Sequence, residues 1–194
     1  MNFFKNFIEQ YKIALDNISE KEFNKTVDLF VKLKKDKGRL FIIGLGGSAG
    51  NASHAVNDFR KLCNINAMAL TDNVSEFTAR VNDEGWENVF ADWLKWNKAN
   101  QKDLVLIFSV GGGNLKKKVS HNISKAIIYS KKKNIKIIGV VGKSNGDTYK
   151  NADNLHFINI IDQKLITPIT ESMQPFVWHM LVSHPKIQVN KTKW

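Results

Sequence analysis

The sequence has only one cysteine, Cys63, among its 194 residues. A single thiol excludes an intrachain disulfide framework and gives no zinc-finger spacing. Long apolar runs are also missing, since the longest, Leu104–Phe108 and Ile137–Val141, are far too short to span a bilayer. The first residues contain no basic region followed by an apolar core, so we predict no signal peptide. These absences favour a cytoplasmic protein without a membrane segment.

Acidic residues are scarce: 18 aspartates and glutamates stand against 29 lysines and arginines, which gives a formal net charge of +11. Such an excess is typical of nucleic-acid binders, because cationic side chains neutralise phosphates. The lysine clusters at 32–37, 116–118 and 131–136 form no basic motif with interleaved aromatic residues, and no recognition helix accompanies them. The charge therefore favours a lysine-rich surface over a nucleic-acid partner, and its positive field would suit a small anionic substrate.

The pattern of apolar residues predicts an α/β protein. Periodicity indicates two helices before residue 38, the second opened by the capping-box pattern Ser19-Glu20-Lys21-Glu22. The expected strands then cover residues 39–43, 67–70, 103–109, 135–141 and 155–160, and the expected helices 48–63, 73–99, 114–133 and 170–183. Apolar strands that alternate with helices are typical of a parallel sheet covered on both faces, in a three-layer doubly wound fold.

No linker or repeat divides the chain, and 43% of its residues are apolar, enough for one sizeable core. We expect one domain over residues 1–194. It comprises amino-terminal helices at 1–37, an α/β core at 38–184 and a polar tail at 185–194.

Two of the expected strands end in glycine-rich turns that lead into helices, at 44–48 (Gly-Leu-Gly-Gly-Ser) and 109–114 (Ser-Val-Gly-Gly-Gly-Asn). In a doubly wound sheet such turns expose backbone N–H groups and helix N-termini beyond the carboxyl ends of the strands. Glycines also permit tight turns without any ligand. Two such turns on one sheet edge nevertheless favour an anion site, most simply a phosphate site.

The first turn is not a dinucleotide fingerprint, because Ala49 stands where the third glycine is required. Asp72 lies near the place of the ribose-binding acid of such sites, and neither turn is followed by a Walker lysine. We therefore expect no nucleotide cofactor.

Four titratable residues are spaced to share helix faces. His54 and Asp58 are four apart, and Glu171 and His179 are eight apart. Two carboxylates and two imidazoles suit a divalent metal site or an acid/base pair, although each alone is more often a surface charge or a hydrogen-bonded histidine. Pro175 lies between Glu171 and His179, so their alignment requires a kink or a helix start there.

The sequence also contains five tryptophans, whose flat rings would suit a sugar. Helical spacing favours the core or a subunit interface for the first four. The five residues are Trp86, Trp93, Trp96, Trp178 and Trp194.

The segment 44–54, Gly-Leu-Gly-Gly-Ser-Ala-Gly-Asn-Ala-Ser-His, resembles the phosphoheptose isomerase branch of the SIS (sugar isomerase) family. That branch typically has Gly-Asn-Gly-Gly-Ser, then a helix with His and, four residues later, Glu. The resemblance continues through 70–75, 81–86, 108–114 and 171–179, and covers about residues 1–184 in order and spacing. It implies a five-stranded parallel sheet sandwiched by helices, and a homotetramer with active sites between subunits.

The resemblance also implies an activity, the conversion of sedoheptulose 7-phosphate into a manno-heptose 7-phosphate for surface polysaccharide. Asp58 takes the place of the family's glutamate base and His179 that of its histidine acid. A zinc site would comprise His54, Asp58, Glu171 and His179. The sugar phosphate would be held by Gly46, Gly47, Ser48, Asn51, Asp83, Ser109, Gly111, Gly112, Gly113 and Asn114.

Four departures from the family pattern keep a second function open. Leu45 replaces the asparagine of Gly-Asn-Gly-Gly-Ser, and the 109–114 turn lacks two serines of the family's phosphate loop. Asp58 is one methylene shorter than glutamate, and Glu171 stands where glutamine is more frequent. The lost polar groups favour a non-catalytic SIS module that senses a phosphosugar or engages another protein. The retained titratable set favours the isomerase.

Overall fold

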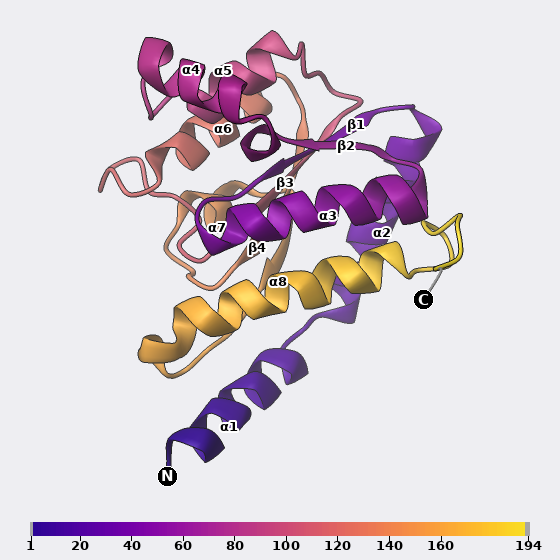
Figure 1. The fold of residues 1–194 in the computed structure, drawn as a ribbon. Coiled ribbons are helices and arrows are strands. Elements are labelled where there is room, and N and C mark those ends of the chain that lie inside the picture. Colours follow the sequence, from indigo (N-terminus) through magenta and orange to yellow (C-terminus); the bar gives the residue numbers. More distant parts are fainter. Residues whose placement is uncertain (1, 193–194) are drawn as a thin grey trace.

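The computed structural model describes residues 2–192 and contains a five-stranded parallel sheet between two layers of helices (Figure 1). The strands are β1 (Arg39–Ile43), β2 (Asn66–Ala69), β3 (Leu104–Ser109), β4 (Lys136–Val141) and β5 (Asn154–Phe157). Their order is β2-β1-β3-β4-β5, and every pairing is parallel. The chain changes direction across the sheet between β1 and β3, where doubly wound proteins bind ligands. The predicted fold class is confirmed.

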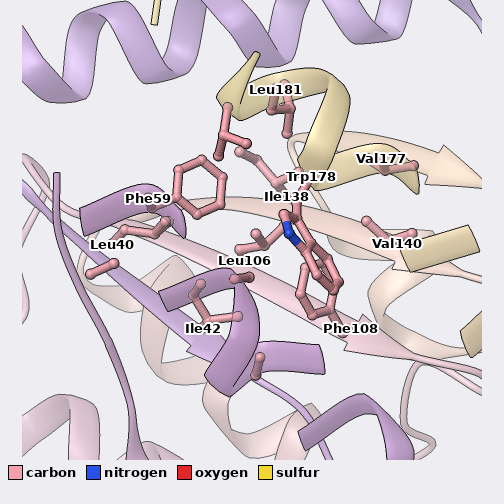
Figure 2. Packing of buried hydrophobic residues seen from close by; sticks show 14 of the residues in the cluster. Leu40, Ile42, Phe59, Leu106, Phe108, Ile138, Val140, Val177, Trp178 and Leu181 are labelled. Carbon is pink, nitrogen blue, oxygen red and sulfur yellow. The ribbon is translucent and has the colours of Figure 1, made fainter. Parts of the chain in front are cut away.

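One face of the sheet, named here the α3–α8 face, is covered by α2 (Glu20–Lys35), α3 (Gly47–Cys63) and α8 (Ile166–Val182). The helices α3 and α8 lie side by side, and α1 (Phe3–Asp16) extends beyond α8 (Figure 1). Figure 2 shows strand residues such as Leu106 and Phe108 packed against Trp178 of α8.

The opposite face, named here the α5–α6 face, is covered by α5 (Val89–Trp96) and α6 (His121–Lys132). Alternate residues of each strand point to opposite faces, so Phe41 and Ile43 reach this layer while Leu40 and Ile42 reach the other. Helix α4 (Val74–Glu84) packs against α5, and the short α7 (Asp147–Asn151) against α6 and β4. Two 3₁₀ turns, η1 (Leu70–Asp72) and η2 (Gln163–Leu165), complete the described elements.

Three of the predicted helices differ from the structure, and one short helix was not predicted. The expected helix at 73–99 is two helices, since Gly85 follows α4 with a φ of 85°. The helix after β3 begins at His121 rather than near residue 114, and α7 was not predicted. The last helix begins at Ile166, four residues early, and continues through Pro175.

Helix α8 tolerates Pro175 because a side chain of α3 replaces the missing hydrogen bond. Proline has no N–H to donate to the carbonyl four residues back, which is that of Glu171. The Asn51 side-chain amide donates to this carbonyl oxygen at 2.8 Å. The unpaired acceptor is therefore satisfied across the α3–α8 interface, as a partly buried carbonyl requires.

The remaining expectations on the chain have mixed outcomes. Within residues 2–192 no helix has both the length and the apolar character that a membrane crossing requires. Trp93 and Trp178 are buried in the core, and Trp86 and Trp96 are 40% and 61% exposed, so for these two the expected subunit interface stays a prediction. Trp194 lies outside the described residues, and the division into one domain stays a prediction.

Candidate active site between α3 and α8

Helices α3 and α8 bring three of the four predicted titratable residues together. The Asp58 Oδ2 atom lies 3.4 Å from His54 Nε2 and 3.3 Å from His179 Nε2. One ligand atom of each residue lies within 4.8 Å of the other two. His54 and Asp58 meet because four residues make about one helical turn, and His179 reaches them because α8 runs beside α3.

The carboxylate of Asp58 is the buried centre of this cluster. Asp58 is 4% exposed, while the side chains of His54 and His179 are 57% and 50% exposed. Beyond the two imidazoles, Trp178 Nε1 donates to Oδ2 at 3.1 Å and Asn57 Nδ2 donates to Oδ1 at 3.1 Å. A buried carboxylate requires such compensation, because burial without hydrogen bonds or opposite charge strongly disfavours its ionised form.

The cluster offers the donor types of a zinc site, two imidazole nitrogens and one carboxylate oxygen, within 4.8 Å of one another. A tetrahedral zinc bound at about 2.0–2.1 Å holds its ligand atoms about 3.4 Å apart. The two distances between Asp58 Oδ2 and the imidazole nitrogens, 3.4 and 3.3 Å, match that separation. Two nitrogen ligands and one oxygen ligand are a frequent catalytic zinc set, in which the fourth position stays open. The exposed sides of both imidazoles face the solvent, from which water or substrate would enter.

Glu171, the fourth predicted ligand, lies apart from the other three. It is not a member of the cluster that His54, Asp58 and His179 form. Its carboxylate lies instead against Gly47, where a Cβ atom would be only 2.5 Å from Oε2. Gly47 is the first residue of α3, so the carboxylate occupies the helix end that favours negative charge.

Ser48 and Asn51 were predicted to contact substrate, but their side chains join α3 to α8. Gln174 Nε2 donates to Ser48 Oγ at 3.0 Å, and Asn51 Nδ2 donates to Gln174 Oε1 at 2.8 Å. Ser48 and Gln174 are 2% and 0% exposed. These contacts hold the two helices in register. Sequence reasoning missed Gln174, whose polarity within an apolar helix was the available signal.

The turn after β1 has the geometry that its glycines allow. Gly46 has a φ of 59°, a backbone angle that residues other than glycine rarely adopt, and it directly precedes the first turn of α3. The backbone thereby presents the amino end of α3 at the carboxyl edge of the sheet. Leu45, which stands in place of the family's asparagine, packs against the apolar cluster of the α5–α6 face.

The turn after β3 is held by its own backbone and by α7. Gly112 N donates to Ser109 Oγ at 2.9 Å, while Thr148 N and Thr148 Oγ1 donate to Gly112 O at 2.9 and 2.8 Å. Gly112 and Gly113 have φ values of 72° and 74°. The predicted glycines therefore form a shaped turn at the sheet edge, and Gly111 faces open space.

A carboxylate that the sequence reasoning missed closes the far end of this turn. Asp147 Oδ2 accepts from Leu115 N at 2.8 Å and from Ser124 Oγ at 2.6 Å. Asn114 Oδ1 accepts from Lys117 N at 2.9 Å and so serves a local turn. Leu115 N and Ser124 Oγ, two donors near the predicted phosphate loop, are therefore already paired with the Asp147 carboxylate.

Asp83 does not join the α3–α8 cluster within this chain. It is exposed near the end of α4, and its Oδ1 accepts from Asn82 Nδ2 at 2.8 Å. Helix α4 packs against α5 and η1, and its apolar residues contact the α5–α6 face.

The parallel sheet, with a glycine turn after each of the two strands that flank its switch point, defines a doubly wound α/β protein. The chain belongs to the SIS domain family, whose model matches residues 3–142. The sequence resemblance to this family is therefore confirmed.

Three proteins illustrate the relationship. The chain is 31% identical over 158 residues to the lincomycin biosynthesis protein LmbN of Streptomyces lincolnensis, a match that covers 76% of this chain and 56% of LmbN. It is 26% identical over 183 residues to a phosphoheptose isomerase of Helicobacter pylori strain P12, with 91% and 85% covered. The solved structure of phosphoheptose isomerase GmhA from Neisseria gonorrhoeae has the same fold, with a TM-score of 0.76, 20% identity and 92% of each chain covered.

Proposed function

We propose that this chain is an aldose–ketose isomerase that acts on a sugar phosphate, converting sedoheptulose 7-phosphate into D-glycero-D-manno-heptose 7-phosphate. The observation that carries the proposal is the convergence of the exposed His54 and His179 on the buried Asp58 between α3 and α8. Membership of the SIS family and the likeness to proteins named phosphoheptose isomerase support the substrate class.

In this proposal Asp58 is the base and His179 the acid. Isomerisation moves a proton between C1 and C2, so a base must meet one carbon while an acid serves the neighbouring oxygen. Asp58 is 4% exposed, and both imidazoles flank its Oδ2. A substrate carbon would therefore lie against the two imidazoles, within reach of His179.

The residues that would hold a zinc ion are His54, Asp58 and His179, whose donor types suit zinc and whose ligand atoms lie within 4.8 Å of one another. Zinc would supply stabilisation of the negative charge that develops on the substrate oxygen. Glu171 belongs to the proposal as a contact to a sugar hydroxyl, because a carboxylate at the amino end of α3 accepts hydrogen bonds.

The two glycine turns would bind the phosphate and the sugar chain. The proposed donors are the Ser109 hydroxyl and the backbone N–H groups of Gly46, Gly111 and Gly113. Gly47 and Ser48 would shape this site from beside the Glu171 carboxylate and Gln174. Asn51, Asp83, Gly112 and Asn114 complete the proposed set. For Asn51 and Asn114 the role is indirect, since their side chains already shape the α3–α8 interface and the turn.

We also infer a homotetramer with active sites between subunits, located in the cytoplasm. The exposed apolar side chains of α1 support an interface there, since Phe3 and Phe4 are 72% and 71% exposed. Light scattering of the full chain would test the stoichiometry.

The direct test is an isomerisation assay with sedoheptulose 7-phosphate on metal-free and zinc-loaded protein. Asp58→Asn removes the charge of the base, and Asp28→Asn on the exposed side of α2 is the matched control. We expect turnover in the wild type and in the control, and a loss of at least about 100-fold in Asp58→Asn. Wild-type protein that binds the sugar phosphate without turnover would overturn the proposed isomerase activity.

One observation favours a second function, that of a non-catalytic module which binds a phosphosugar. The turn after β3 has lost two hydroxyl donors, and Asp147 already occupies Leu115 N and Ser124 Oγ. A sensor would bind the sugar phosphate equally well in the wild type and in Asp58→Asn. Calorimetry and the isomerisation assay on both proteins together separate the two functions, because a sensor binds the sugar phosphate and shows no turnover.

A further inference from the structure

We propose that Trp178 is a positioning residue for Asp58, and that the two side chains form one unit in which the indole orients a shortened carboxylate. The inference rests on the proposed function, because it concerns how the His54–Asp58–His179 cluster is held ready. It adds to the site a residue whose burial had marked it only as part of the core.

The indole N–H is aimed at the oxygen on which the cluster converges. Trp178 Nε1 donates to Asp58 Oδ2 at 3.1 Å, and the same oxygen lies 3.3–3.4 Å from both imidazoles. Hydrogen bonds to a charged acceptor are stronger than neutral ones. Loss of this donor would leave the buried carboxylate short of a partner and free to turn.

The ring that carries the N–H is itself immobilised. Trp178 is 0% exposed and packs against Phe108 of β3, with ring centroids 5.5 Å apart (Figure 2). On its other side it meets the His54 ring at 5.4 Å and the His179 ring at 5.0 Å, both edge to face. The sheet therefore fixes the indole, and the indole in turn fixes one carboxylate and borders both imidazoles.

The short side chain at position 58 gives this contact its importance. A glutamate there would carry its carboxylate about 1.5 Å further from α3, the length of one C–C bond. That displacement would drive it into the indole or between the imidazoles, because Oδ2 already touches all three. Asp58 and Trp178 thus suit each other, and neither is expected to tolerate a change of the other alone.

The experiment measures zinc affinity by competition with a chromophoric chelator, and isomerase rate on the same samples. The first variant is Trp178→Phe, which removes the N–H and part of the ring. Its matched control is Trp93→Phe, because Trp93 is also buried, at 3% exposed, but lies on the α5–α6 face against Phe41. A second replacement, benzothienylalanine at position 178, keeps the ring shape and removes only the N–H.

We expect both changes at position 178 to weaken zinc binding by about 10–100-fold, as loss of partners behind metal ligands typically does. Trp93→Phe should match Trp178→Phe in stability and the wild type in zinc affinity. Substitution with cobalt adds a spectroscopic readout, since a carboxylate that has turned alters the visible absorption of the bound ion. Zinc affinity within twofold of wild type in the benzothienylalanine protein would overturn the proposal.

A rescue variant tests the pairing of the two side chains. Asp58→Glu alone should weaken zinc binding, and Asp58→Glu with Trp178→Leu should recover part of the loss, because the smaller side chain makes room for the longer carboxylate. Equal losses in the single and the double variant would contradict the pairing. Wild-type protein that neither binds zinc nor isomerises the substrate would overturn the proposed function itself, and this inference with it. If the wild type binds zinc and isomerises the substrate, and the Trp178 variants match it in both, the inference alone is overturned.

Discussion

The two faces of the sheet bury similar apolar layers but treat their polar groups differently. On the α5–α6 face Trp93 packs edge to face on Phe41, with ring centroids 5.1 Å apart, inside an apolar cluster. On the α3–α8 face Trp178 is equally buried, yet its indole N–H donates to Asp58. Two tryptophans of similar burial therefore serve packing alone on one face, and packing together with a polar site on the other.

Further polar contacts cross the α3–α8 face. Gln174 links Ser48 and Asn51, and Thr26 Oγ1 pairs with His156 at 2.9 Å between α2 and β5. Each of these groups would be costly to bury unpaired, so the pairs stabilise the face, although Asn154 Oδ1 and Thr170 Oγ1 are buried there without a partner among the described residues. The contrast teaches that this face gives up simple apolar packing to hold polar groups in fixed positions.

The largest expected effect comes from replacing one histidine on each face with glutamine. We expect His179→Gln to lower the isomerase kcat by about 10²–10⁴-fold, because it removes the proposed acid and one zinc ligand. His121→Gln on α6 of the opposite face should leave kcat within twofold. The measurement is steady-state kinetics with sedoheptulose 7-phosphate, and equal losses in both variants would erase the distinction between the faces.

The buried histidine of the α3–α8 face predicts a pH dependence of stability. Burial lowers the pKa of His156 to about 4, although the charge of Glu22 opposes the shift. In the unfolded chain its pKa is about 6.5. Between these two values the unfolded state binds more protons, so the free energy of unfolding decreases as the pH is lowered. The loss should begin near pH 6.5, end near pH 4 and reach about 3 kcal/mol.

Urea unfolding at several pH values would measure this loss. His156→Gln keeps a hydrogen-bonding group beside Thr26 and removes the titration, so its free energy of unfolding should vary less over the same pH window. If the free energy of unfolding of this variant depends on pH as strongly as that of the wild type, the acid sensitivity comes from other groups.

The single cysteine is expected to be protected by the same interface. Cys63 ends α3, its Sγ atom lies 3.7 Å from Val182 O, and burial raises its pKa to about 11. Compared with a thiol of pKa 9.0, this lowers the thiolate fraction at pH 8 about 100-fold. A thiol reagent should therefore label native protein at least about 100-fold more slowly than urea-unfolded protein. Similar rates would mean that α3 and α8 separate readily.

The smallest effects come from two glycines near the start of α3. In Gly44→Ala the new Cβ would meet Ser48 O at 2.1 Å, a backbone atom, so we expect a destabilisation of about 2–3 kcal/mol. Gly50→Ala has nothing within 4 Å and lies in the helix, so it should stabilise by about 0.5–1 kcal/mol. Thermal unfolding of both variants checks the difference, and a neutral Gly44→Ala would show that the turn after β1 yields easily.

Much of the architecture could be predicted from the sequence because it depends on local patterns. Apolar runs such as that of β3 and the glycine turns after β1 and β3 locate the strands and their carboxyl ends, and alternation with helices requires a parallel sheet. The weaker predictions were helix boundaries. Gly85 divides one expected helix, and Pro175 fails to break another, because the side chain of Asn51 replaces the lost hydrogen bond.

The sequence by itself determined the family, the sheet and the nearness of His54 to Asp58, which one helical turn ensures. Only the tertiary structure decided which residues of α8 meet that pair. Eight residues rotate a helix about 80° beyond whole turns and advance it about 12 Å, so Glu171 and His179 cannot point at one spot within a single helix. The packing of α8 beside α3 selects His179 and Trp178 for the cluster and leaves Glu171 at Gly47.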